Sequence, residues 1–88
     1  MNSKKILFSI IIPIRAENKY LLETKKCLSL QTYKNFELLV ITDDISKSPN
    51  PCIKRNIGAK LAKGDYLCFI DDDSYPDKNW LQNIFGKI

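Results

Sequence analysis

Three adjacent aspartates, Asp71, Asp72 and Asp73, are the residues of this chain best suited to chemistry. They directly follow an apolar run at residues 65–70, although Asp is a poor strand former and neighbouring like charges repel. Carboxylates at the end of a strand are typical ligands of a hard divalent cation. The segment therefore predicts a metal site, and the alternative is an Asp-rich turn that ends at Pro76.

The elements that must position these aspartates begin with three apolar runs, at residues 6–12, 36–41 and 65–70. Each predicts a strand, and the first and third are apolar on both alternating faces, as in buried parallel strands. Helical patterns lie between and after them: from Asn18 to about Gln31, from Pro51 to Lys63 with Ile53, Ile57 and Leu61 every fourth residue, and from Pro76 onwards. Residues 45–51 are predicted to be a proline-broken loop. The order βαβαβα predicts an α/β fold with a Rossmann-like parallel sheet.

Polar residues follow every predicted strand. The first strand is followed by Pro13, Ile14, Arg15 and Glu17. The second is followed by Asp43 and Asp44, and the third by the three aspartates. Because the carboxyl ends of parallel strands meet at one edge of a sheet, and open sheets bind ligands there, we expect these residues to share a site.

The composition is that of a small globular domain. The 88 residues are 44% hydrophobic and 27% charged, and we expect residues 1–88 to form a single, partial domain. The net charge of +4 comes from dispersed lysines, which is not the pattern of a nucleic-acid-binding protein. Three widely spaced cysteines without any histidine favour reduced cytoplasmic thiols over a zinc site or a disulfide framework. Lys4 and Lys5 before the first apolar run imitate a secretory signal, but Pro13 and Arg15 interrupt it, and we interpret the run as a strand.

Five ordered segments carry a resemblance to a known family. They are residues 9–18 (SIIIPIRAEN), 29–37 (SLQTYKNFE), 54–59 (KRNIGA), 64–66 (GDY) leading into the aspartates, and Trp80-Leu81. With these segments the chain resembles the N-terminal, nucleotide-sugar-binding half of family 2 glycosyltransferases of the GT-A fold. The resemblance implies a glycosyltransferase that uses a nucleotide-diphosphate sugar, with a UDP-sugar favoured, and Mn²⁺ or Mg²⁺.

The resemblance also implies a role for individual residues. The backbone from Pro13 to Arg15 and the Asp43 carboxylate would hold the base, with Asp44 as the alternative one residue along. Asp73, the last residue of the family's DxD signature, would bind the metal, and Asp71 would face the ribose or the metal's water shell. Arg55 would lie near the diphosphate. Asp72 and Glu17 complete the implied donor site, although an acid in the position of Glu17 also suits the first turn of a helix.

Two departures from the family limit this interpretation. The segment between Asp44 and Lys54 is much shorter than is usual in the family. The acceptor-binding half, with the general base of inverting enzymes, would begin beyond Ile88, so the chain alone is expected to transfer sugar poorly. A nucleotide-binding fragment without activity is one alternative, and a haloacid-dehalogenase-like phosphatase is a remote one, because Tyr75 stands where that family has Thr or Val.

The same resemblance implies the partners of the protein. The acceptor would be a sugar or a lipid-linked glycan, and the exposed edge of the truncated sheet predicts self-association. We expect a cytoplasmic protein, with membrane association of the full-length protein left open.

Overall fold

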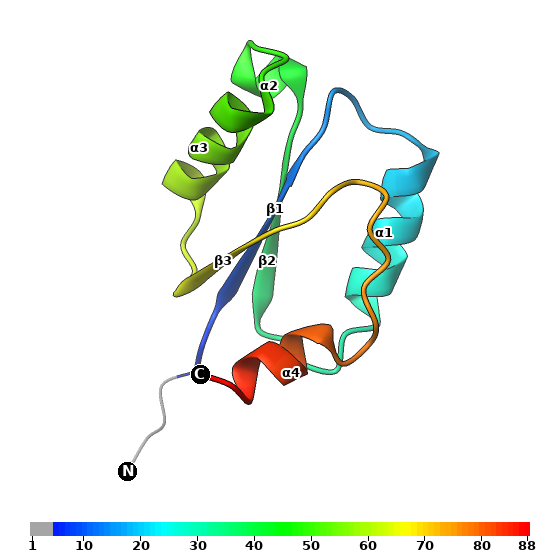
Figure 1. Ribbon diagram of the computed structural model, residues 1–88, viewed down its shortest axis with the longest axis vertical. Coiled ribbons are helices and arrows are strands. Elements are labelled where there is room, and N and C mark those ends of the chain that lie inside the picture. The colour runs from blue at the N-terminus through cyan, green and yellow to red at the C-terminus, as the bar shows by residue number, and fades with distance from the viewer. Residues whose placement is uncertain (1–4) are drawn as a thin grey trace.

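The structure, a computed structural model, describes residues 5–88 (Figure 1). Lys4, which belongs to the signal-like start, lies outside the described residues. The elements are, in order, β1 (Phe8–Pro13), α1 (Lys19–Ser29), β2 (Phe36–Ile41), α2 (Asp43–Ser46), α3 (Pro51–Leu61), β3 (Tyr66–Phe69) and α4 (Trp80–Phe85).

The three strands form one parallel sheet in the order β2-β1-β3. β1 pairs with β2 from Phe8 opposite Phe36 to Pro13 opposite Ile41, and with β3 from Phe8 opposite Tyr66 to Ile11 opposite Phe69. The predicted α/β fold with a Rossmann-like parallel sheet is confirmed. β1 is the central strand, which explains why its apolar run has no polar alternation.

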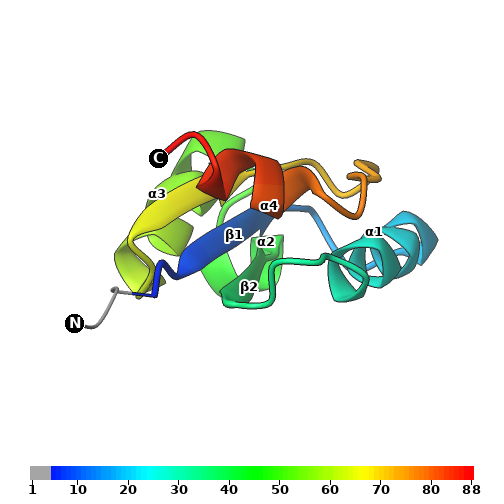
Figure 2. The same cartoon turned by 90° about the horizontal axis from the view of Figure 1, so that it is seen from below.

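Helices cover both faces of the sheet (Figures 1 and 2). On one face, Phe8, Ile10 and Ile12 of β1 pack in a core with residues of α1 and α4, among them Leu21 and Leu81. On the other face α3 crosses β1 and β2 at close range. A Cβ on Gly58 of α3 would lie 2.5 Å from the Ile11 Cγ2 atom, so glycine is what lets the helix approach the sheet.

A hydrogen-bonded network ties the three strands together at their amino ends. The buried Ser9 hydroxyl donates to Glu37 Oε2 (2.6 Å) and accepts from the Gly64 N–H (2.8 Å), while the Lys63 N–H also donates to Glu37 Oε2 (2.6 Å). These bonds favour the carboxylate, so the pKa of Glu37 is lowered, with the Ser9 hydroxyl as the largest cause. A Cβ on Gly64 would lie 2.3 Å from Ser9 Oγ and 2.8 Å from the Leu7 carbonyl oxygen.

The predicted burial of the third strand is wrong. β3 is an edge strand that is shorter than the predicted run, and Tyr66, Leu67 and Phe69 are each more than 40% exposed. Its second edge has no neighbouring strand among residues 5–88, and α3 lies over β1 and β2 instead. An apolar sequence on both faces therefore does not distinguish a central strand from an edge strand whose outer surface is uncovered.

The first and last helices are shorter than predicted. α1 has the expected Asn18 cap, whose side chain accepts from the Leu21 N–H (3.0 Å), but it ends at Ser29. Gln31 lies beyond it, fully buried: its Nε2 donates to the Asp77 carbonyl (2.6 Å) and its Oε1 accepts from the Leu81 N–H (3.0 Å). α4 accordingly begins at Trp80, after a non-helical segment that Gln31 holds in place.

The short helix α2 overlaps the segment predicted as a loop after the second strand, at residues 45 and 46. Thr42 caps it by accepting from the Ile45 N–H (3.2 Å), and Lys47 ends it in the left-handed conformation at φ 58°. α3 then begins at Pro51, as predicted. Its buried positions are Lys54 and Gly58, whereas Ile53 and Leu61, two members of the predicted apolar repeat, are 40% and 54% exposed.

Candidate functional site

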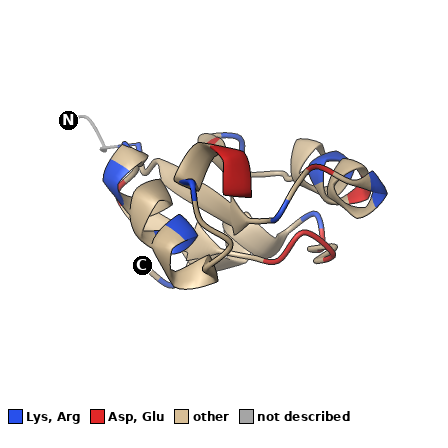
Figure 3. Ribbon diagram, turned by 90° about the horizontal axis from the view of Figure 1, so that it is seen from above, with Lys and Arg blue, Asp and Glu red and all other residues tan. Residues whose placement is uncertain are grey.

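The carboxyl ends of the strands bring the predicted polar segments to one edge of the sheet. Beyond β1 and β2, the Ile14 N–H donates to the Ile41 carbonyl and the Asp43 N–H donates to the Arg15 carbonyl, both at 3.0 Å. This pairing continues past the ends of both strands and places Asp43 beside Arg15. Figure 3, which looks at this end of the molecule, shows acidic ribbon both in α2 and in the loop after β3.

The aspartate loop after β3 is anchored to α1. The fully buried Thr24 hydroxyl lies 2.5 Å from the Asp72 carbonyl oxygen and 2.8 Å from that of Ser74, and its single proton serves both. Asp72 Oδ2 accepts from Asn18 Nδ2 (3.0 Å), and the Ser74 N–H donates to the Asp71 carbonyl (3.1 Å). These hydrogen bonds hold the backbone of the three adjacent aspartates in a turn against α1.

Two neighbouring pockets at this edge share Pro13. The first, of about 340 Å³, is lined by Pro13, Arg55, Phe69, Ile70, Asp71 and Ser74. The second, of about 380 Å³, is lined by Pro13, Ile14, Arg15, Ala16, Asn18, Pro49, Pro51, Lys54 and Asp72. Six of the residues singled out from the sequence therefore line this pair of pockets, and cationic and anionic side chains face each pocket together.

Four other predicted residues do not line these pockets. Asp43 lies at the margin of the second pocket, bonded to residues that line it. The Asp44 side chain is 96% exposed and pairs with Lys47, and Glu17 pairs with Lys25 along α1, both at 3.7 Å. Asp73 is exposed at the tip of the loop.

The pKa of Tyr75 is affected by carboxylates around that loop. Desolvation and then the nearby Asp73 carboxylate raise the pKa of the Tyr75 phenol, with Glu23, Tyr20 and Asp72 contributing less. Carboxylates of the aspartate loop and of α1 therefore lie near the Tyr75 phenol.

The carboxylates can be tested against a divalent cation. Among residues 5–88, no three Asp, Glu, Cys or His side chains converge as a closed metal cage. Mg²⁺ in nucleotide sites uses one or two carboxylates together with substrate phosphates and water, so a cage is not required. Asp71, facing a pocket that also holds Arg55, fits that pattern, and Asp73 follows it two residues later.

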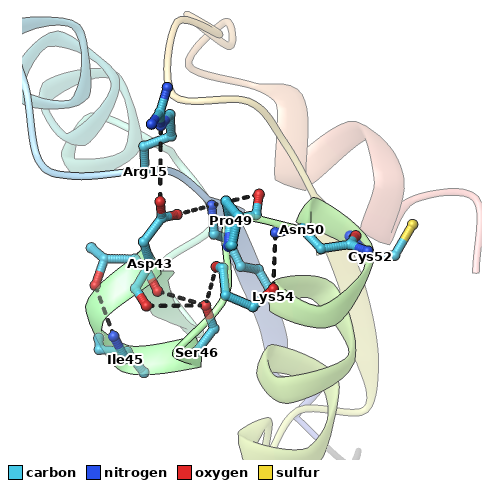
Figure 4. Close-up of polar contacts among 10 residues, drawn as sticks. Arg15, Asp43, Ile45, Ser46, Pro49, Asn50, Cys52 and Lys54 are labelled. Carbon is cyan, nitrogen blue, oxygen red and sulfur yellow. Dashed lines mark hydrogen bonds and ion pairs between the residues drawn. The ribbon is translucent and has the colours of Figure 1, made fainter.

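Lys54 is the charged residue lining these pockets that the sequence pattern did not single out. It is 2% exposed, its ammonium lies against Asp43 Oδ1, and it reaches the Pro49 carbonyl at 3.4 Å (Figure 4). Asp43 Oδ2 faces Arg15 Nε at 3.8 Å on the other side. The available signal was its position: Lys54 is one turn before Gly58, the glycine that packs against the sheet, so both must face inwards.

Comparison with known proteins adds independent information. A family model described as "Glycosyl transferase family 2" matches residues 46–88. An uncharacterized glycosyltransferase of Rickettsia conorii is 36% identical over 97% of this chain, which corresponds to 18% of the relative. The amylovoran biosynthesis glycosyltransferase AmsB of Erwinia amylovora is 30% identical over 97% of the chain and 36% of the relative. These matches therefore extend over most of the first 45 residues, which the family model does not reach.

The chain belongs to glycosyl transferase family 2. It spans between about a sixth and about a third of the length of the first glycosyltransferases that it matches. The two alignments run over 108 and 110 residues, more than the 88 of this chain, so the relatives carry additional residues within the matched span.

The name of a relative with lower sequence identity refers to a polymer. The poly(ribitol-phosphate) beta-N-acetylglucosaminyltransferase TarS of Staphylococcus aureus is 27% identical over 92% of the chain.

Within residues 5–88 the longest helices are α1 and α3, and neither these nor the shorter helices are long and apolar enough to cross a bilayer.

Proposed function

We propose that this family 2 chain is the donor-binding segment of a glycosyltransferase. It would bind a nucleotide-diphosphate sugar, with a UDP-sugar preferred, together with Mn²⁺ or Mg²⁺. The observation that carries the proposal is the pair of pockets that meet at Pro13, one lined by Arg55 and Asp71 and the other by Ile14, Arg15 and Asp72. A nucleotide diphosphate needs such a combination, because its base, its phosphates and its metal must be bound side by side.

Each pocket suits a different part of the donor. Arg55 is half-buried on α3, and its guanidinium can bind phosphate oxygens with two parallel hydrogen bonds. Asp71 lies in the same pocket, and with Asp73 it would hold the metal next to the diphosphate. A bound divalent cation would neutralise charge that develops on the departing diphosphate. The second pocket, which Pro13, Ile14 and Pro49 help to line, would take the base beside Asp43.

The acceptor side of the reaction is proposed from the relatives. Two of their names refer to polymers, amylovoran and poly(ribitol-phosphate), so we propose that the full-length protein glycosylates a growing polysaccharide or a lipid-linked glycan. A general base for the acceptor hydroxyl would contribute about 10²–10⁴-fold to the rate. We place that base outside residues 1–88.

Calorimetry tests the donor site directly. Mn²⁺ is titrated into the 88-residue chain with and without UDP, and we expect the apparent Mn²⁺ affinity to rise at least tenfold with UDP present, because phosphate completes the coordination. Asp73→Ala and Asp71→Asn should remove that gain. Glu23→Gln, which removes an exposed carboxylate paired with Lys26 on α1, is the matched control. Equal Mn²⁺ affinity with and without UDP would overturn the proposal.

A further inference from the structure

Lys54 and Asp43 form an ion pair that is closed on one side and open on the other. Lys54 is 2% exposed, and removing an ammonium from water costs several kcal/mol unless a counter-charge compensates it. That counter-charge is Asp43 Oδ1, which is itself buried and accepts no hydrogen bond of normal geometry among the described residues. The Lys54 ammonium is thus the ionic partner of Asp43 Oδ1.

The two oxygens of Asp43 have different surroundings. The Asp43 side chain is 31% exposed although Oδ1 is buried, so its exposure lies on the Oδ2 side. Oδ2 is 3.8 Å from Nε of Arg15, whose side chain is 88% exposed. Backbone pairing fixes the position of the residue itself, because the Asp43 N–H donates to the Arg15 carbonyl (3.0 Å). Oδ2 is thus presented at the margin of the pocket that Arg15 and Lys54 line.

We propose that Lys54 is a positioning residue that makes this pocket select uracil over cytosine. By holding Oδ1, Lys54 leaves Oδ2 as an oriented acceptor for a ring N–H of the base. Uracil offers an N–H at ring position 3, whereas cytosine has an unprotonated nitrogen there and an amino group beside it. An oriented carboxylate oxygen therefore favours uracil, and a carboxylate released to rotate would lose that preference. This inference rests on the proposed donor site.

The chain provides a matched set of variants. Lys54→Met keeps most of the apolar stem and removes the charge, and Lys54→Gln retains an N–H donor without the charge. Both leave Asp43 in place, and because its side chain is one-third exposed, its carboxylate can turn to water. Lys60→Met makes the same charge change at an exposed position on the same helix.

The measurement is the ratio of dissociation constants for CDP and UDP, obtained by calorimetry with Mn²⁺ present, after circular dichroism has shown that each variant is folded. For the natural chain and Lys60→Met we expect UDP to bind about tenfold or more tightly than CDP, the size of one hydrogen bond to a charged group. In Lys54→Met the ratio should fall to within about threefold, mainly through weaker UDP binding, and Lys54→Gln should be intermediate.

Each other outcome counts against a defined part of the reasoning. If Lys54→Met weakens UDP and CDP equally, Lys54 supports the fold alone and this inference is overturned, while the donor site stands. If neither Lys54 variant folds, the residue is required for folding and the specificity role is likewise refuted. If the natural chain binds neither nucleotide, the proposed function itself fails.

Discussion

Replacing Asp43 by Asn should destabilise the protein far more than its place on the surface of the sheet edge suggests. The substitution keeps the shape of the side chain but leaves the buried Lys54 ammonium without its counter-charge. Breaking a fully buried pair costs about 3–5 kcal/mol. Since water reaches one side of Asp43, we expect a loss of about 2–3 kcal/mol here, or on the order of 10–20 °C in Tm for a domain of this size.

Urea and thermal unfolding followed by circular dichroism measure this loss. Asp44→Asn is the control, because the Asp44 and Lys47 side chains are 96% and 82% exposed and such a pair contributes about 0–1 kcal/mol. The double variant Asp43→Asn with Lys54→Met should recover most of the stability, since it removes both charges from the site. If Asp43→Asn is as stable as Asp44→Asn, or if the double variant is no better than Asp43→Asn, the buried-pair interpretation is refuted. Nucleotide binding by Asp43→Asn must accordingly be measured where that variant is still folded.

Further substitutions test other contacts. Thr24→Val removes the hydroxyl that joins α1 to the aspartate loop and should cost about 1–3 kcal/mol, while Thr24→Ser should be close to neutral in the same unfolding assay. Gly64→Ala forces a Cβ against backbone atoms and should cost about 1–3 kcal/mol, whereas Gly86→Ala should not, because its Cβ would lie 3.6 Å from the Gln82 carbonyl oxygen. The lowered pKa of Glu37 means that its stabilising effect is complete above the unfolded pKa, near 4.5, and is lost as pH falls through the folded pKa; urea unfolding between pH 6 and pH 3 should show this loss, and Glu37→Gln should flatten it. We propose that the uncovered β3 edge makes the chain self-associate, so Leu67→Lys should lower the weight-average mass in sedimentation at high concentration, and an unchanged mass would contradict that role.

The parallel sheet and the convergence of the strand ends could be predicted from the sequence, because both depend on local patterns. Apolar runs, the Asn18 cap and Pro51 each mark their element without knowledge of its neighbours. The rule that parallel strands end at one edge then brings Arg15 and Asp71 to the same region. The assigned roles of these residues in binding stay predictions.

The features that were missed depend on contacts between distant segments. The exposure of β3 follows from which strand has neighbours on both sides, and the apolar run at residues 65–70 does not encode that. Gln31 was placed in a helix by its spacing, but its buried amide bonds residues 46 to 50 positions away. Lys54 was passed over because lysine is rarely buried, and its burial becomes understandable when Asp43 is placed beside it.

The central position of β1 has a consequence for how the chain is made. Ser9 meets its β2 partner Glu37, 28 residues away, whereas Leu7 meets Asp65, 58 residues away. The longer loop adds only about 0.6 kcal/mol of closure entropy, but a ribosome needs about 2–6 s to synthesise the intervening thirty residues. During that interval one side of β1, with Ile10 and Ile11, has no strand to pair with. The nascent chain should therefore be most vulnerable to aggregation between the completion of β2 and the emergence of β3.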